Sequence, residues 1–259
     1  MKHTLTMLLH GESGMGKSTT ADSVPGPRLI LDAEGRAQYT PSGPKIVWDP
    51  IRYAPPEYDG TWETCVVNVT DYDIMMKVYT WLRSGQHPFV SVVVDSLMEL
   101  QMRCQDKIAG TNQLKTQDWG ELLRALSSLM RNYRDLTLVA ENPTRVVVFV
   151  TGSRNIEGTM RPMLQGQMAD RAPYLIDVVG YLFTAPSVNE DGSPGPLVRK
   201  MLTQPQPGFV AKDGTGLLPP ILDIPDPRVT GRRAITELVQ ALEQRGKAES
   251  FNATEEVAQ

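Results

Sequence analysis

Cysteine and long apolar runs are scarce in this sequence, and both shortages restrict its class. The chain contains only Cys65 and Cys104, and neither stands in a CxxC or Cys/His cluster. A zinc site and a disulfide framework are therefore disfavoured. The opening residues, MKHTLTMLLHGESG, are apolar over a few positions only, and no later run approaches membrane-spanning length. We expect a soluble cytoplasmic protein that has no membrane partner.

The sequence also has no excess of positive charge. The 26 Lys and Arg residues face 30 Asp and Glu residues, which gives a net charge of -4. The chain as a whole therefore does not attract nucleic acid. Any contact with DNA or RNA must come from a local basic patch or from several subunits in line. Hydrophobic residues at 41% and charged residues at 22% are ordinary for a globular protein.

Short apolar runs alternate with amphipathic segments through the first 150 residues, and strands alone follow. This order predicts an α/β fold with a mainly parallel sheet flanked by helices and extended by an antiparallel C-terminal meander. Helices are expected from Gly16, after the cap Asp71, near Leu97 and after the cap Asp118. Strands are expected at residues 5–9, 28–31, 45–48, 64–69, 89–94, 145–150, 174–184 and 197–203.

The expected organisation is one domain over residues 1–228, then a C-terminal helix over residues 229–245 with Thr230 as its cap. Residues 152–171 are polar and punctuated by glycine, which predicts a long functional loop or a short helix. Residues 246–259 carry several glutamates and no apolar period, so a disordered acidic tail is expected.

The segment GESGMGKS matches G-x-x-x-x-G-K-[ST] at every required position, after an apolar strand and before a helix. In such a loop the backbone N–H groups hold the phosphates, Lys17 reaches the β- and γ-phosphates, and Ser18 ligates Mg²⁺. The predicted cofactors are ATP and Mg²⁺; the alternative is a glycine-rich turn with a solvated lysine. The predicted nucleotide contacts are Gly11, Glu12, Ser13, Gly14, Met15, Gly16, Lys17, Ser18 and Thr19.

Carboxylates follow two of the predicted strands. Asp95 ends VSVVVDS and is predicted to hold Mg²⁺ with Ser18, the Walker B role, although a helix cap is the alternative. Glu34 and Asp32 follow the strand of LILDAEG. Glu34 is the predicted base that polarises the attacking water, Asp32 is the second choice, and a solvated turn acid is the alternative.

The motifs LILDAEG, VVVDSL and RVVVFVTG together resemble the RecA recombinase core. The overall length, the Gln117–Trp119 segment and the Ala211–Asp213 segment resemble a phage-encoded branch of RecA-like ATPases of single-strand annealing and recombination. The resemblance covers roughly residues 3–225. It implies that the domain over residues 1–228 is a RecA-like P-loop ATPase domain. It implies that Glu34 is the catalytic glutamate and that the activity is DNA-stimulated ATP hydrolysis. It also implies single-stranded DNA as partner, self-association into a ring or filament, a possible single-strand-binding protein as partner, and the bacterial host cytoplasm as location.

Two groups of cations receive roles from the same resemblance. Lys212 is placed to reach the γ-phosphate of a neighbouring subunit, with Arg199 or Lys200 as second choices; the alternative is a surface lysine. Arg154, Arg161 and Arg171 are placed on a DNA-binding loop, because arginines pair with phosphates and stack on bases. The alternative for them is a solvated loop or a subunit contact.

Competing functions remain open at this stage. A small-molecule or nucleotide kinase also carries a P-loop, and its acceptor site would be closed by an arginine-rich lid. A non-catalytic nucleotide-gated assembly protein is the third possibility, against which Glu34 argues. A GTPase is disfavoured because the sequence has no NKxD motif.

Overall fold

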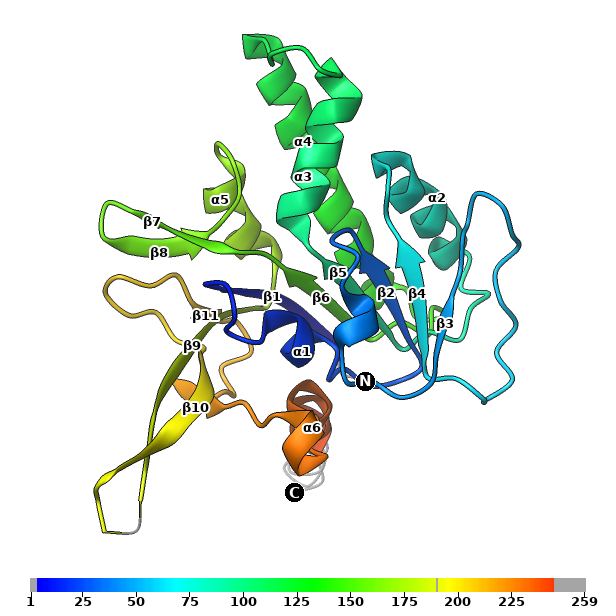
Figure 1. The fold of residues 1–259 in the computed structure, drawn as a ribbon. Coiled ribbons are helices and arrows are strands. Elements are labelled where there is room, and N and C mark those ends of the chain that lie inside the picture. Colours follow the sequence, from blue (N-terminus) through cyan, green and yellow to red (C-terminus); the bar gives the residue numbers. More distant parts are fainter. Residues whose placement is uncertain (1–3, 190, 245–259) are drawn as a thin grey trace, which may run out of the picture.

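A ten-stranded sheet forms the centre of the computed structural model, which describes residues 4–189 and 191–244 (Figure 1). Its strands are β1 (Leu5–Gly11), β2 (Arg28–Asp32), β3 (Lys45–Val47), β4 (Thr64–Asn68), β5 (Ser91–Asp95), β6 (Val146–Val150), β9 (Val178–Val188), β10 (Pro194–Leu202), β11 (Lys212–Asp213) and β12 (Ile221–Asp223). The order is β12-β10-β9-β1-β6-β5-β2-β4-β3, and β11 pairs with β9. Every residue of β6 is buried, as expected for a β-branched strand covered on both faces.

Helices cover both faces of this sheet (Figure 1). Successive side chains of a strand point to opposite faces, so Leu8 and Leu9 join different hydrophobic cores. The core that contains Leu8 packs beneath three helices, and the core that contains Leu9 packs against α1 and the last helix. The helices are α2 (Tyr72–Arg83), α3 (Leu97–Ala109) and α4 (Thr116–Asp135) on the first face, and α1 (Lys17–Ala21) with residues 234–244 on the second.

The C-terminal strands form the predicted antiparallel extension. β9 runs parallel to β1 along one edge and antiparallel to β10 along the other, and β12 adds antiparallel to β10. The predicted fold class, a mainly parallel α/β sheet of the P-loop type with an antiparallel C-terminal part, is confirmed. β9 begins four residues later than predicted, because Ala172–Leu175 forms a short 3₁₀-helix (η3) first.

Residues 152–171 depart from the prediction of a loop or short helix. They form a hairpin of β7 (Ser153–Ile156) and β8 (Thr159–Pro162), followed by the short helix α5 (Met168–Arg171). Glu157 and Gly158 make the two-residue turn with φ of 51° and 80°. Positive φ at both turn residues is the geometry that matches the twist of two antiparallel strands.

Two predicted helix caps are wrong. Asp118 is the third residue of α4, and its carboxylate accepts the N–H of Lys115 at 2.7 Å from inside the helix. Thr230 ends the short helix α6 (Pro227–Thr230), which Asp226 caps, and the last helix starts at residue 234. The predicted tail at 246–259 lies outside the described residues. None of the helices in the described part of the chain is long and apolar enough to cross a membrane.

Candidate functional site

The glycine-rich loop connects β1 to α1 and lines a cavity of about 670 Å³. Gly14 and Gly16 adopt φ of 83° and 81°, which residues with a side chain rarely reach. A Cβ on Gly11 would lie 2.6 Å from the carbonyl oxygen of Leu182 in the neighbouring strand. Of the nine predicted nucleotide contacts, Met15 is the one outside the cavity lining, and it packs against the hydrophobic core instead.

Lys17 lies at the first position of α1 and projects back over the loop. Its Nζ donates to the carbonyl oxygen of Glu12 at 2.7 Å. Burial lowers its pKa, and the nearby carboxylates of Asp95 and Glu34 oppose this shift. The lysine is therefore a partly buried cation that lines the cavity, where it can pair with phosphate.

Ser18 and Asp95 meet at the predicted metal site. Asp95 ends β5, and its carboxylate is hydrogen-bonded by the Ser18 side chain. Burial, together with the negative charges of Glu34 and Asp32, raises the pKa of Asp95 to about 6, although the hydrogen bond from Ser18 and the charge of Lys17 oppose the shift. A half-buried carboxylate beside a hydroxyl offers the hard oxygen ligands that suit Mg²⁺, so these residues fit the ion.

Asp32 and Glu34 lie close in sequence and differ in their contacts. The Asp32 carboxylate accepts the N–H groups of Glu34 at 3.1 Å, Gly35 at 2.8 Å and Ala37 at 2.7 Å, and thereby shapes the turn after β2. Glu34 lines the cavity, and its Oε1 accepts from the Ser96 hydroxyl at 2.6 Å. Of these two acids, Glu34 is the one that lines the cavity.

The sequence did not indicate that Ser96 and Arg36 belong to the site. The Ser96 hydroxyl caps α3 and donates to Glu34, which fixes the direction of that carboxylate. Arg36 also lines the cavity, with its Nε 3.7 Å from Glu34 Oε2. Ser96 directly follows Asp95, and Arg36 lies two residues after Glu34. This closeness to motif residues is the only sequence signal that could have indicated them as site residues.

His10 connects the cavity wall to a distant loop. It is fully buried on β1, its Nδ1 lies 2.8 Å from Ser153 Oγ, and its Nε2 lies 2.7 Å from the Val210 carbonyl oxygen. Burial lowers its pKa to about 4, so the ring is neutral at pH 7. Since the carbonyl can only accept, Nε2 carries the proton and Nδ1 accepts from Ser153.

Of the three cations predicted to act on a neighbouring subunit, one lines the nucleotide cavity of its own chain and two do not. Lys212 donates to the carbonyl oxygens of Ile176 at 2.7 Å and Pro173 at 3.3 Å, and it is not part of the cavity lining. Lys200 pairs with Asp223 at 2.7 Å. Arg199, in contrast, lines the cavity of its own chain.

Arg228 was not predicted as a site residue and also lines the cavity. It lies on α6, and its Nη2 donates to the Thr19 hydroxyl at 3.1 Å. Arg228 is 209 positions from Thr19 in sequence, so only the folded chain reveals the contact.

The arginines predicted to bind DNA gather around the β7–β8 hairpin. Arg154 and Arg161 lie directly opposite each other in the hairpin. Arg154 donates to the Leu164 carbonyl oxygen at 2.7 Å, and Arg161 donates to Asp170 at 2.6 Å. Arg171 follows Asp170 on α5 and donates to Gln167 at 2.9 Å. None of these arginines lines the nucleotide cavity. This position argues against the kinase alternative, in which they would form a lid over the bound nucleotide.

A glycine-rich loop between a buried parallel strand and a helix, with Ser18 against a strand-end aspartate, defines a P-loop nucleoside triphosphatase. A family model described as an AAA domain matches residues 3–215, and the chain belongs to this family. The protein is accordingly a nucleotide-binding ATPase. No curated protein matches the sequence.

Proposed function

We propose that this ATPase acts on single-stranded DNA in phage-type homologous recombination or strand annealing. One observation carries the proposal: both ends of the β7–β8 hairpin, which bears the arginines, lie at the nucleotide cavity. Gly152 and Ser153, where the hairpin begins, and Met163, where it ends, all line the cavity. A change in the nucleotide therefore acts on both ends of the hairpin.

The residues of the cavity suit hydrolysis of the γ-phosphate. Lys17 binds the β- and γ-phosphates, and the loop N–H groups hold the phosphate chain. Glu34, oriented by Ser96, accepts a proton from the water that attacks the γ-phosphate, and the bond to the β-phosphate oxygen breaks to release ADP and phosphate. Ser18 and Asp95 would hold Mg²⁺, which neutralises charge on the phosphate oxygens.

Coupling to the hairpin has a second route through His10. The Ser153 hydroxyl at the start of β7 donates to His10, and His10 donates to Val210. The Val210 N–H in turn donates to the carbonyl oxygen of Met160 on β8 at 3.0 Å. Both strands of the hairpin are thus tied to the loop strand β1, which supports a link between nucleotide state and DNA contact.

The arginine group carries only a modest charge in one subunit. Arg161 is paired with Asp170, and Glu157 stands at the hairpin turn. We therefore propose that several subunits align their hairpins in a ring or filament, which would concentrate Arg154, Arg161 and Arg171 into one basic stripe. In such an assembly Lys212 would approach the cavity of the next subunit.

The test is ATP hydrolysis with and without single-stranded DNA at several salt concentrations. DNA should raise the rate, and both the binding and the stimulation should weaken steeply with salt, because bound cations release counterions from DNA. Replacing Arg154 and Arg161 together by alanine should abolish the stimulation and spare the basal rate. Arg83→Ala, an exposed arginine on α2, is the matched control, and Lys17→Ala is the variant without nucleotide binding.

The opposite results would be equally clear. A rate that DNA does not change would contradict the proposal. Transfer of the γ-phosphate to a small acceptor would instead identify a kinase, and tight binding of ATP with no hydrolysis would identify an assembly protein gated by nucleotide.

A further inference from the structure

Two arginines from the C-terminal part of the chain form one wall of the nucleotide cavity. Arg199 on β10 lies against the loop: a Cβ added to Gly16 would meet its Nε at 2.7 Å. Arg228 on α6 contacts Thr19, the residue after the predicted Mg²⁺ ligand Ser18. The P-loop motif itself supplies Lys17 alone as a cation, so these arginines add to what the motif provides.

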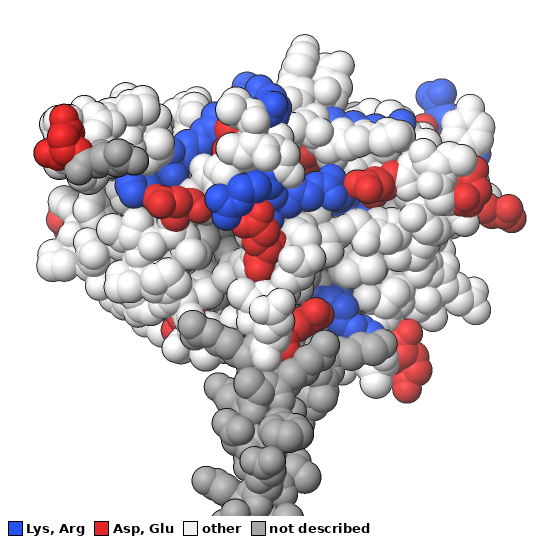
Figure 2. Space-filling model, turned by 90° about the horizontal axis from the view of Figure 1, so that it is seen from below, with Lys and Arg blue, Asp and Glu red and all other residues white. Residues whose placement is uncertain are grey.

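These two guanidinium groups share one carboxylate partner among the described residues. Asp226 Oδ2 lies 3.1 Å from Arg199 Nη1, and Asp226 Oδ1 lies 3.5 Å from Arg228 Nε. Two positive charges therefore face one negative charge at this wall. Figure 2 looks at the side on which α6 lies and shows a band of Lys and Arg interspersed with Asp and Glu. A cavity wall with surplus positive charge is suited to an anionic ligand.

The sheet order shows which part of a nucleotide would meet this wall. Asp95 ends β5 and Glu34 follows β2, and both strands lie on one side of β1, whereas Arg199 belongs to β10 on the other side. Ser18 and Asp95 would hold Mg²⁺, and Glu34 is the proposed base for attack on the γ-phosphate, so this side of β1 would receive the γ-phosphate end of the nucleotide. The arginines therefore face the opposite end of the phosphate chain.

We infer that Arg199 and Arg228, held together by Asp226, bind the phosphates nearest the ribose, the ones that ADP and ATP share. Arginine suits this role because its planar group donates several hydrogen bonds to phosphate oxygens. The inference rests on the nucleotide-binding part of the proposed function and does not involve DNA.

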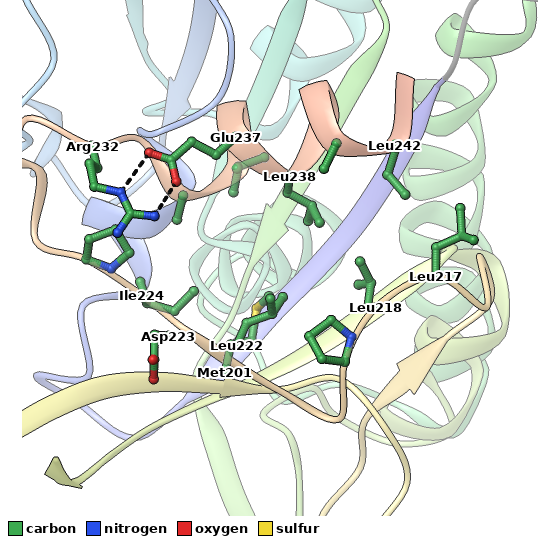
Figure 3. Close-up of a pocket in the computed structure, with 15 residues that line it drawn as sticks. Met201, Leu217, Leu218, Leu222, Asp223, Ile224, Arg232, Glu237, Leu238 and Leu242 are labelled. Carbon is green, nitrogen blue, oxygen red and sulfur yellow. Dashed lines mark hydrogen bonds and ion pairs between the residues drawn. The ribbon is translucent and has the colours of Figure 1, made fainter. Parts of the chain in front are cut away.

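Calorimetric binding of MgADP and of a non-hydrolysable ATP analogue tests the inference. Arg199→Gln and Arg228→Gln should each weaken both ligands by the same factor, about tenfold for a charge-assisted hydrogen bond. Arg232→Gln is the control. Arg232 lies two residues after α6, and it pairs with Glu237 at 2.7 Å beside a separate apolar cavity of about 280 Å³ (Figure 3). It should leave both affinities unchanged.

Each alternative has its own result. Weaker binding of the ATP analogue alone would place the arginines at the γ-phosphate, and unchanged binding of both ligands would make them structural anchors; either result overturns the inference. If a glutamine variant does not fold, Arg→Lys at the same position keeps the charge and should weaken both ligands equally by a smaller factor, whereas unchanged affinity overturns the inference. A wild-type protein that binds neither ligand would contradict the nucleotide site itself.

Discussion

Glu34 and Asp32 show how contacts separate two acids that the sequence presents as a pair. Glu34→Gln should retain nucleotide binding and the hydrogen bond from Ser96, because an amide oxygen still accepts. It should lose turnover by a factor on the order of 10² to 10⁴, since the amide cannot take the proton of water. A steady-state assay of phosphate release, with nucleotide affinity measured in parallel, checks this.

Asp32→Asn is the comparison variant. One carboxylate oxygen accepts from Glu34 and Gly35 and the other from Ala37, so the amide loses one accepted bond. We expect a loss of stability of about 1 kcal/mol and a smaller effect on turnover. If Asp32→Asn abolished turnover while Glu34→Gln did not, the base would be Asp32.

His10 makes stability depend on pH. The unfolded chain takes up this proton near the ordinary pKa of 6.5, but the folded protein takes it up only at about 4. The stability contribution is therefore complete above pH 6.5 and is lost as the pH falls toward 4, on the order of 3 kcal/mol in total. Denaturant unfolding at pH 7 and at pH 5 should show the decrease.

His10→Gln should reduce this pH dependence, because its amide can donate to Val210 and accept from Ser153 without titrating. His87, whose pKa burial also lowers to about 4, remains in the variant and supplies the residual slope. Identical slopes in the two proteins would exclude His10 as the cause.

Among the elements, the β7–β8 hairpin is the one at which a substitution should change DNA stimulation without changing basal hydrolysis, if the proposed function holds. Gly158 has φ of 80° and open space around its Cβ position, so Gly158→Ala introduces only backbone strain, about 1 to 2 kcal/mol. We expect lower DNA stimulation and an unchanged basal rate. Equal losses in the two rates would show that the hairpin serves the nucleotide site alone.

The sequence predicted the elements whose signals are local. β6 is a run of buried apolar residues, and the glycine-rich loop has fixed spacing, so both lie where they were expected. The hairpin was missed because its strands, SRNI and TMRP, are short, polar and only partly buried. Such strands lack the alternation of apolar and polar residues from which a strand is predicted.

The sequence predicted the site residues that belong to motifs and missed the arginines on the opposite wall of the cavity. Lys17, Ser18 and Asp95 belong to motifs whose chemistry requires these residue types, and the fold brings them together. Arg199 and Arg228 belong to no motif. Their positions depend on the pairing of β10 with β9 and on the path of the chain to α6, which are tertiary facts.

For the whole molecule, the proposed assembly predicts complementation between inactive variants. Lys212→Ala and Lys17→Ala should each lose DNA-stimulated ATPase activity alone. When they are mixed, an interface that joins an intact P-loop to an intact Lys212 should recover part of the activity. A rate per subunit that rises with protein concentration would agree with a site completed by a neighbour.

Lys212 also bonds the carbonyl oxygens of Ile176 and Pro173, so the thermal stability of Lys212→Ala must be measured first. Lys200→Ala, which removes a partly exposed ion pair with Asp223, is the matched control and should stay active. No recovery on mixing, together with a monomeric mass in the presence of ATP and DNA, would contradict the assembly.

The last helix bears on where this chain can be shortened. Ile235, Val239 and Leu242 are buried in the core that contains Leu9, and the Ile235 N–H donates to the Ser23 hydroxyl just after α1. A recombinant fragment that stops at residue 215, where the family match ends, would lack these side chains as well as Arg228. We expect such a fragment to accumulate in inclusion bodies, whereas one that stops at residue 244 should be recovered folded and bind nucleotide.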